Sequence, residues 1–401
     1  MTLNIPSSPI GLIRKIEERL IMYKIKKFST LTAVALVATS LLAPMGAMAG
    51  DRPSMLAPLG DPPNPASNPT TPEKVELGKM LFFDGRLSGN GTMACVVCHL
   101  PDEGWDFPDK ISMGYPGTVH WRNSQTIINS AYYNKLFWAG SSGSLEGQAR
   151  SAARGGVAGN GEDDGLEARL AFVPEYVERF NDVFGDTWPN VRNAYRAIAA
   201  FERTLVQTDT PFDNYMRGDD KALNKAELAG LDLFTGKAGC SSCHDGALLS
   251  NQKYYNTGVP TYDGWQTNAL DQITFRFEIF AKGVTEDKYR TYKEDPGLYF
   301  RTKETADLGK FRVPSLRYTK YTAPYMHNGM IESLEEVIEF YNAGGGTNDF
   351  SATKTDQIQP LDLSKKEKAN LLAFLESLSG DRIEMDYPDL PPTEPLPAPI
   401  E

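Results

Sequence analysis

A motif of the form Cys-x-x-Cys-His occurs twice in this chain of 401 residues. Its members are Cys95, Cys98 and His99 in the first copy and Cys240, Cys243 and His244 in the second. In such a motif both thiols form thioethers with the vinyl groups of a haem, and the histidine binds the iron. A thioredoxin-like dithiol, a split zinc site or a disulfide would leave the repeated histidine unexplained. The motifs therefore predict two covalently bound haem c groups.

Helical patterns precede both motifs and end in related sequences. These are Gly78-x-x-Leu81-Phe82 and Gly230-x-x-Leu233-Phe234, and their helices are expected to start at Thr71-Pro72 and at Asn224 with Glu227. Further helical periodicity covers residues 191–205, 333–341 and 364–378, the last two with capping boxes Ser333/Glu336 and Ser364/Glu367. Strand-like alternation is scarce. We expect a mainly α fold of two packed cytochrome c-like domains related by internal duplication.

The expected boundaries follow from composition. Residues 1–49 have a basic stretch, an apolar stretch and an Ala47-Met48-Ala49 cleavage site, which predicts a signal peptide, with residues 1–21 as a possible upstream extension. The first haem domain is expected at 50–210, the second at 211–385, and a proline-rich tail, either an extended strap or a disordered end, at 386–401. Residues 155–165 are expected to form a polar glycine-rich loop.

Charge and hydropathy limit the partners. The formal net charge is −11, and removal of residues 1–49, with six Lys/Arg and two Asp/Glu, takes it to −15. So acidic a chain is not expected to bind nucleic acid. The N-terminal apolar run is short and closely followed by Pro44, which argues against a membrane span. We expect an exported, periplasmic protein that does not span the membrane.

The histidine count restricts the axial ligands. His99 and His244 are assigned as proximal ligands, so only His120 and His327 remain for the far sides of the irons. An electron carrier usually has both axial positions filled by protein, whereas an enzyme that activates peroxide keeps one open. The sixth ligands must come from His120, His327, Met326, Met330 or a tyrosine, or be absent.

The chain resembles the bacterial dihaem cytochrome c peroxidase and MauG family over nearly all of its mature length. The matching stretches are Leu77–Asp84, Arg122–Thr126, Phe137–Gly140, Ala200–Leu205, Pro211–Asp213, Phe311–Arg317 and Thr322–Gly329. The resemblance implies a haem enzyme that uses hydrogen peroxide. The branch that the chain belongs to is left open by these matches.

Tyr341 helps to decide whether the chain resembles the peroxidases or MauG more closely. Leu334, Val337, Ile338 and Tyr341 share one helical face, so the phenol points with the apolar stripe. Periodicity alone favours an ordinary core tyrosine that hydrogen-bonds a carbonyl. The resemblance implies a ligand of the second haem, because the peroxidases have a methionine here and MauG has a tyrosine. Met326 and Met330 rank second for this role.

The resemblance also assigns residues to the first haem, the expected site of peroxide reaction. Gln148 matches the distal glutamine, but the family's distal proline and glutamate are missing near Ala152 and Val157-Ala158. An acid within residues 162–164 could replace the glutamate, although such a loop is more often simply solvated. His120 lies close to the position of a histidine that caps this haem in many peroxidases, but its spacing to Asn123 favours a surface or supporting role.

The resemblance extends to residues between the haems. Trp138 matches a tryptophan that relays electrons between them. Asn123 matches a calcium ligand, with further carbonyl ligands expected at Thr302 and Glu304. His327 is expected to contact the second haem or its propionates without binding the iron.

Three functions compete at this point. In the first, which we favour, peroxide drives a high-valent dihaem state that oxidises, over a long range, a tryptophan of an exported partner protein, as in MauG; the methanobactin-linked relative is a closer fit than MauG itself. In the second, a cytochrome c peroxidase reduces peroxide with electrons from a small cytochrome or cupredoxin. The third, an electron carrier without catalysis, is disfavoured by the shortage of histidines.

Overall fold

The computed structural model describes residues 52–393, so the predicted signal peptide lies outside the described part of the chain. The described residues are mainly helical, which confirms the expected fold class. The α-helices are α2 (Pro72–Phe83), α3 (Leu145–Arg154), α4 (Asp163–Ala171), α5 (Pro174–Phe184), α6 (Val191–Glu202), α7 (Pro211–Met216), α8 (Lys225–Thr235), α9 (Gly264–Thr267), α10 (Ala269–Ala281), α11 (Glu286–Thr291), α12 (Tyr299–Thr302), α13 (Leu334–Asn342) and α14 (Lys365–Ser377). Strands β1 (Tyr254–Tyr255) and β2 (Phe311–Arg312) pair antiparallel, Tyr254 opposite Arg312. None of the helices within residues 52–393 is long and apolar enough to cross a membrane.

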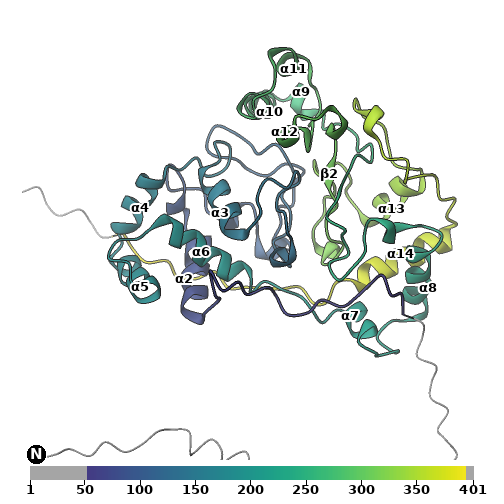
Figure 1. Cartoon of the computed structure of the whole chain (residues 1–401), viewed down its shortest axis with the longest axis horizontal. Helices are drawn as coiled ribbons and strands as arrows, with labels where there is room; N and C mark the ends of the chain where they lie inside the picture. The colour runs from purple at the N-terminus through teal and green to yellow at the C-terminus, as the bar shows by residue number, and fades with distance from the viewer. Residues whose placement is uncertain (1–51, 394–401) are drawn as a thin grey trace, which may run out of the picture. The chain divides into compact units, whose positions relative to one another are not determined.

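The first hydrophobic core forms where α2 crosses α6 (Figure 1). The crossing is close because Gly78 has no side chain: a Cβ there would lie 1.9 Å from the carbonyl oxygen of Ala197. Phe82, fully buried, packs its ring 5.4 Å from that of Phe201. The glycine therefore lets the helix before the first haem motif lie directly on the helix that ends this half.

The second core repeats the arrangement with α8 and α14. A Cβ at Gly230 would lie 2.1 Å from the carbonyl oxygen of Asn370, and the ring of the buried Phe234 lies 5.0 Å from that of Phe374. Both repeated Gly-x-x-Leu-Phe sequences thus make the same helix crossing ahead of a haem motif. This parallel supports the inferred internal duplication.

The helix ends agree with the sequence predictions except in three places. The Asn224/Glu227 and Ser364/Glu367 capping boxes are both complete. The Ser333/Glu336 box is only half formed, because the Glu336 carboxylate accepts from the backbone N–H of Glu332 instead of Ser333. The helix expected at 191–205 ends at Glu202, and the glycine-rich loop is shorter than expected because α4 already begins at Asp163.

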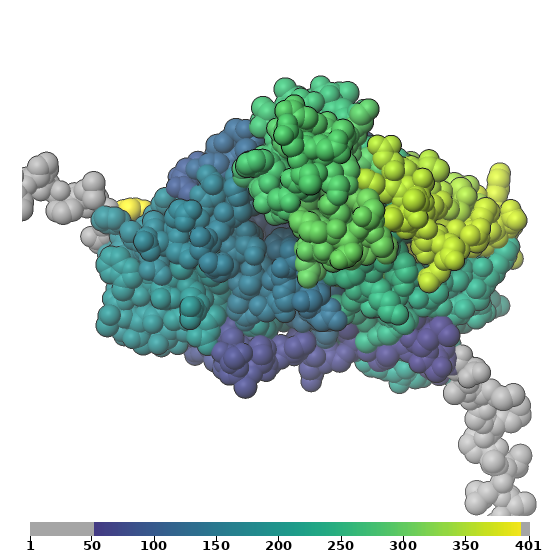
Figure 2. All heavy atoms as spheres, turned by 45° about the horizontal axis from the view of Figure 1, so that its top comes forward, coloured from purple at the N-terminus to yellow at the C-terminus, as the bar shows by residue number. Residues whose placement is uncertain are grey.

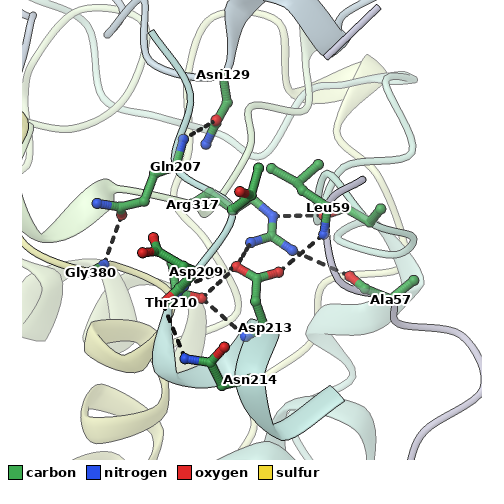
Figure 3. Close-up of polar contacts among 12 residues, drawn as sticks. Ala57, Leu59, Asn129, Gln207, Asp209, Thr210, Asp213, Asn214, Arg317 and Gly380 are labelled. Carbon is green, nitrogen blue, oxygen red and sulfur yellow. Dashed lines mark hydrogen bonds and ion pairs between the residues drawn. The ribbon is translucent and has the colours of Figure 1, made fainter. Parts of the chain in front are cut away.

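The two ends of the described chain each cross to the opposite half (Figure 1). The segment before α2 packs Leu56 into the second core, and the segment after α14 packs Ile383 and Met385 against the first. Figure 3 shows the junction beside α7, where the buried ion pair of Arg317 and Asp213, 2.7 Å long, also bonds the N-terminal segment. Both halves are therefore held together by segments from either end of the chain.

A lobe formed by α9 to α12 lies beside the region where the halves meet, drawn in green in Figure 2. Its small core stacks Trp265 on Phe275, with ring centroids 4.8 Å apart, and packs them near Trp121 and Val157 of the first half. Helical periodicity in the sequence predicts no helices in this lobe. Short helices with an interrupted apolar pattern give a weak sequence signal.

Candidate haem sites

Both Cys-x-x-Cys-His motifs begin as short 3-10 helices, at Cys95–Val97 and Cys240–Ser242. None of the four cysteines forms a disulfide, and each is partly buried. Burial raises the pKa of Cys95 to about 12 and that of Cys98 to about 11. The two thiols of the first motif are thus kept neutral, which argues against a thioredoxin-like dithiol with a lowered pKa.

The histidines of the motifs are oriented in the same way. Nδ1 of His99 lies 3.3 Å from the backbone oxygen of Trp105, and Nδ1 of His244 lies 3.0 Å from that of Leu249. A carbonyl oxygen only accepts, so Nδ1 carries the proton and Nε2 keeps its lone pair. Burial lowers the pKa of each imidazole to about 4. Each ring is a neutral ligand with one nitrogen available for a metal.

The other readings of the motifs fit the geometry less well. Within residues 52–393 no group of three or more His, Cys, Asp or Glu side chains converges as a metal site, which argues against zinc at either motif. The free thiols argue equally against a disulfide. The donor set of two thiols and one oriented imidazole therefore fits haem c at both places.

A cavity of about 260 Å³ opens beside the second motif. Its lining includes Cys240, Cys243 and His244 together with Tyr341 from α13. The Tyr341 phenol shares the face of α13 with the buried Leu334 and Ile338, as its spacing predicts. Burial raises the pKa of this phenol, and the nearby thiols raise it further. The structure thus brings Tyr341 and His244 into one cavity.

Met326 and His327 line the same cavity. His327 is 6% exposed and stacks on Phe311, with ring centroids 3.7 Å apart. Burial lowers the pKa of His327 to about 3, so the imidazole is neutral. Met326 has a φ of +75° in the loop before α13, whereas Met330 is not part of the lining. Both His327 and Met326 are thus placed beside the second haem site.

Trp138 connects this cavity to the first half. Its indole N–H donates to the backbone oxygen of Asn123, 2.9 Å away, and its ring centroid lies 6.5 Å from that of His327. The backbone N–H of Asn123 in turn donates to the oxygen of His327. Next to it, the buried Arg122 guanidinium bonds both oxygens of Asp295 at 2.5 and 2.8 Å. Trp138 therefore sits in a rigid, hydrogen-bonded contact between the halves.

The residues expected around the first haem are more dispersed. Gln148 lies half-buried in the middle of α3, which packs on α6, and its amide makes no hydrogen bond within residues 52–393. Asp163 pairs with Arg154 at 2.7 Å, and the Glu162 side chain is 86% exposed. These contacts favour the solvated, surface reading of the acidic loop over a role at the haem.

Glu202 is a buried acid that sequence reasoning overlooked. It ends α6 at 4% exposure, and its Oε2 has no hydrogen-bond partner. Burial raises the pKa of the Glu202 carboxyl group to about 8, although the positive charge of Arg203 lowers it in part. When ionised, the Glu202 carboxylate would raise the pKa of the Cys95 thiol, so the two groups interact electrostatically. The available signal was a glutamate within the otherwise apolar end of a helix.

His120 lies in the loop between the first motif and Trp138. Its Nδ1 is 3.1 Å from the backbone oxygen of Arg122, and burial lowers its pKa to about 4. The positive charge of Arg122 lowers that pKa further. The ring is thus anchored to its own loop at Nδ1, an arrangement consistent with a supporting role.

The expected calcium ligands are not gathered by the contacts of the structure. Asn123 is buried, and its side-chain N–H groups donate to the backbone oxygens of Asp109 and Lys110 at 3.4 and 3.3 Å. Thr302 and Glu304 are exposed at the end of α12, in the lobe. Thr322 and Pro324, in contrast, line the same cavity as Asn123.

Comparison with known proteins agrees with this geometry. Residues 72–221 match the family described as di-haem cytochrome c peroxidase. The chain is 54% identical over 350 residues to cytochrome-c peroxidase IdrP1 of Pseudomonas sp., covering 86% of this chain and 92% of that protein. It is 33% identical over 330 residues to methylamine utilization protein MauG of Methylorubrum extorquens, covering 82% and 84%.

A solved structure gives the same result. A MauG-like protein associated with microbial copper homeostasis superposes with a TM-score of 0.67 at 33% identity, covering 82% of this chain and 95% of that one. Two haem motifs in duplicated helical halves, with a histidine oriented in each, are thus accompanied by similarity over most of the chain. The protein belongs to the dihaem cytochrome c peroxidase and MauG family, and it is a haem-dependent oxidoreductase.

Proposed function

We propose that the protein reduces hydrogen peroxide at its first haem with electrons that a protein donor delivers through the second haem. Each turnover would take one peroxide, two electrons and two protons and release two water molecules. The observation that carries the proposal is the pair of oriented, neutral histidines, each following two cysteines that form no disulfide. The high identity to proteins named cytochrome-c peroxidase supports this reaction over others in the family.

The proposal assigns roles to the motif residues. Cys95 and Cys98 would hold the first haem, with His99 as its proximal ligand, and Cys240, Cys243 and His244 would hold the second. When bound, haem c supplies one-electron redox chemistry and, where its iron keeps an open position, a place for peroxide to react. The backbone oxygens at Nδ1 would fix both rings and strengthen them as ligands.

Tyr341 is proposed as the sixth ligand of the second haem. It lines the same cavity as His244, and it shares one face of α13 with the buried Leu334 and Ile338. Occupation of both axial positions would suit the second haem to electron transfer and would leave peroxide to the first. A phenolic oxygen is also a harder and more electron-donating ligand than the thioether of Met326.

Two side chains are proposed to handle protons and polar atoms at the first haem. The Gln148 amide is uncommitted, so it is available to hydrogen-bond peroxide. Glu202 is a buried acid beside Cys95 that would hold a proton at neutral pH. We propose Glu202, and not an acid within residues 162–164, as the group that takes the role of the missing distal glutamate.

Trp138 is proposed as the electron relay between the haems, and His327 as a contact of the second haem. The Trp138 side chain lines the cavity beside the second motif, and its indole N–H donates to the backbone oxygen of Asn123 in the first half. Calcium at Asn123 remains a proposal, with the carbonyl groups of Thr322 and Pro324 better placed than Thr302 and Glu304 because they line the same cavity. Export to the periplasm is also proposed, since haem c is attached outside the bacterial cytoplasm.

One experiment tests the reaction and the relay of electrons. Hydrogen peroxide is added in equal amount to the fully oxidised protein and, separately, to protein with one haem reduced, and haem spectra are followed by stopped flow. We expect the protein with one haem reduced to consume peroxide fast. A reduced small cytochrome c should then sustain turnover. Gln148→Leu should slow the peroxide step, whereas Gln272→Leu, at an exposed position on α10, should not. Equal rates in all three proteins would remove Gln148 from the reaction.

A second function is favoured by Tyr341 and by the MauG relatives. In it, the two haems together withdraw electrons from a tryptophan of an exported partner protein. Addition of peroxide to oxidised protein without a donor separates the two functions. A long-lived spectral change at both haems would support tryptophan oxidation, whereas no reaction until one haem is reduced would support the peroxidase.

A further inference from the structure

The segment after α14 runs along the first half as an extended strap of residues 380–393, the yellow trace that crosses toward α2 and α5 in Figure 1. Its start is fixed by Gln207, whose side chain accepts from the N–H of Gly380 and donates to the oxygen of Asp381, both at 2.7 Å. Further along, Tyr387 packs edge-on against Phe83, and Arg86 donates to the oxygen of Pro391 at 2.7 Å. The strap is therefore attached at several points.

The strap meets one residue that is coupled to the first haem motif. The indole N–H of Trp105 donates to the backbone oxygen of Ile383, 2.8 Å away. The N–H of Ile383 donates in turn to the hydroxyl of Tyr318, 2.7 Å away. Trp105 and Tyr318 are both fully buried. Ile383 is thus clamped on both of its backbone polar groups within the first core.

Trp105 has an uncommon backbone conformation. Its φ is +59°, in the left-handed region that bulky residues rarely adopt. This conformation turns its carbonyl toward the motif, where the oxygen accepts from Nδ1 of His99 and from the N–H of Ile127, both at 3.3 Å. Such a conformation persists only when its surroundings hold it. The aromatic rings of Phe82 and Phe201, each 6.1 Å away, and the strap carbonyl are those surroundings.

The second motif provides an internal comparison. Leu249 takes the corresponding place: it is fully buried, its φ is +52°, and its carbonyl accepts from Nδ1 of His244. A leucine side chain has no hydrogen-bonding group, so it cannot tie its residue to another segment as the Trp105 indole does. A residue with positive φ whose carbonyl accepts from the motif histidine therefore occurs twice. Only in the first copy does the side chain of that residue bond a distant part of the chain.

We propose that the strap is a positioning element for the first haem: the Ile383 carbonyl holds Trp105, and Trp105 holds His99 through its own carbonyl. The hydrogen bond at Nδ1 makes the imidazole a stronger electron donor to iron and fixes its plane. Loss of the hydrogen bond between Trp105 and Ile383 would weaken the bond between the Trp105 carbonyl and Nδ1 of His99. The first haem would then be easier to reduce. The inference rests on His99 as the proximal ligand and is independent of the substrate that the enzyme oxidises.

The test uses the full-length protein with both haems attached. Trp105→Phe keeps an aromatic ring but removes the donor to Ile383, and Trp188→Phe, at an exposed tryptophan, is the matched control. Midpoint potentials of both haems are measured by optical redox titration, and the iron–histidine stretch of the reduced first haem by resonance Raman. We expect an upward shift of the first potential, a lower stretching frequency, and no change at the second haem or in the control.

Unchanged values at the first haem in Trp105→Phe would overturn the proposal, and so would equal shifts at both haems. If Trp105→Phe does not accumulate with two haems, Tyr318→Phe takes its place, because it frees the N–H of Ile383 and should shift the first potential in the same direction. A haem count on the wild type separates this test from the assignment of the motifs. Fewer than two haems per chain would refute the assignment itself.

Discussion

Glu202 makes a quantitative prediction about stability and pH. Burial raises the pKa of its carboxyl group from 4.5 to about 8, because the charged form loses its hydration and Oε2 has no partner. The folded protein therefore keeps a proton that the unfolded chain releases above about pH 4.5. Stability is unaffected by this group below that pH and declines as pH rises toward 8.

The size of the effect follows from linkage. One proton held only by the folded state changes the free energy of unfolding by about 1.4 kcal/mol per pH unit. Over the interval from 4.5 to about 8 the loss approaches about 5 kcal/mol as an upper bound. Glu202→Gln has no titrating group and should lack this slope. The variant should thus be less affected by high pH than the wild type.

The assay is urea unfolding at pH 5, 6, 7 and 8, followed by circular dichroism with the haems attached. The stability of Glu202→Gln relative to wild type should rise steadily across this series. Glu178→Gln, at an exposed position on α5, is the control and should run parallel to the wild type. If Glu202→Gln also runs parallel to the wild type, Glu202 is ionised in the folded protein and the reasoning fails.

Three further predictions concern the helix crossing and the second haem site. Gly230→Ala should cost roughly 3 kcal/mol of stability, as overpacking does, because its Cβ would lie 2.1 Å from the Asn370 oxygen; Gly165→Ala, which meets nothing within 4 Å, should cost far less by the same unfolding assay. Tyr341→Phe should convert the second haem to a high-spin optical and EPR spectrum, and a spectrum like that of the wild type would exclude ligation by Tyr341. Trp138→Phe should slow electron exchange between the haems in stopped flow, whereas an unchanged rate would remove its assigned role.

The sequence by itself determined the features that depend on neighbouring residues. Covalent attachment needs two thiols and a histidine in one short turn, so the motifs were readable without a fold. Helix starts with a capping residue, such as Asn224 and Ser364, were likewise local. The face of α13 that carries Tyr341 followed from helical periodicity.

Only the tertiary structure decided the features that join distant segments. Glu202 stands out in the sequence only as a glutamate at an apolar helix end, and its raised pKa comes from burial that the folded chain alone produces. The tie of Trp105 to Ile383 spans 278 positions, and no local pattern encodes such a contact. Local chemistry thus identified the haem sites, while burial and chain crossing decided how their surroundings are charged and held.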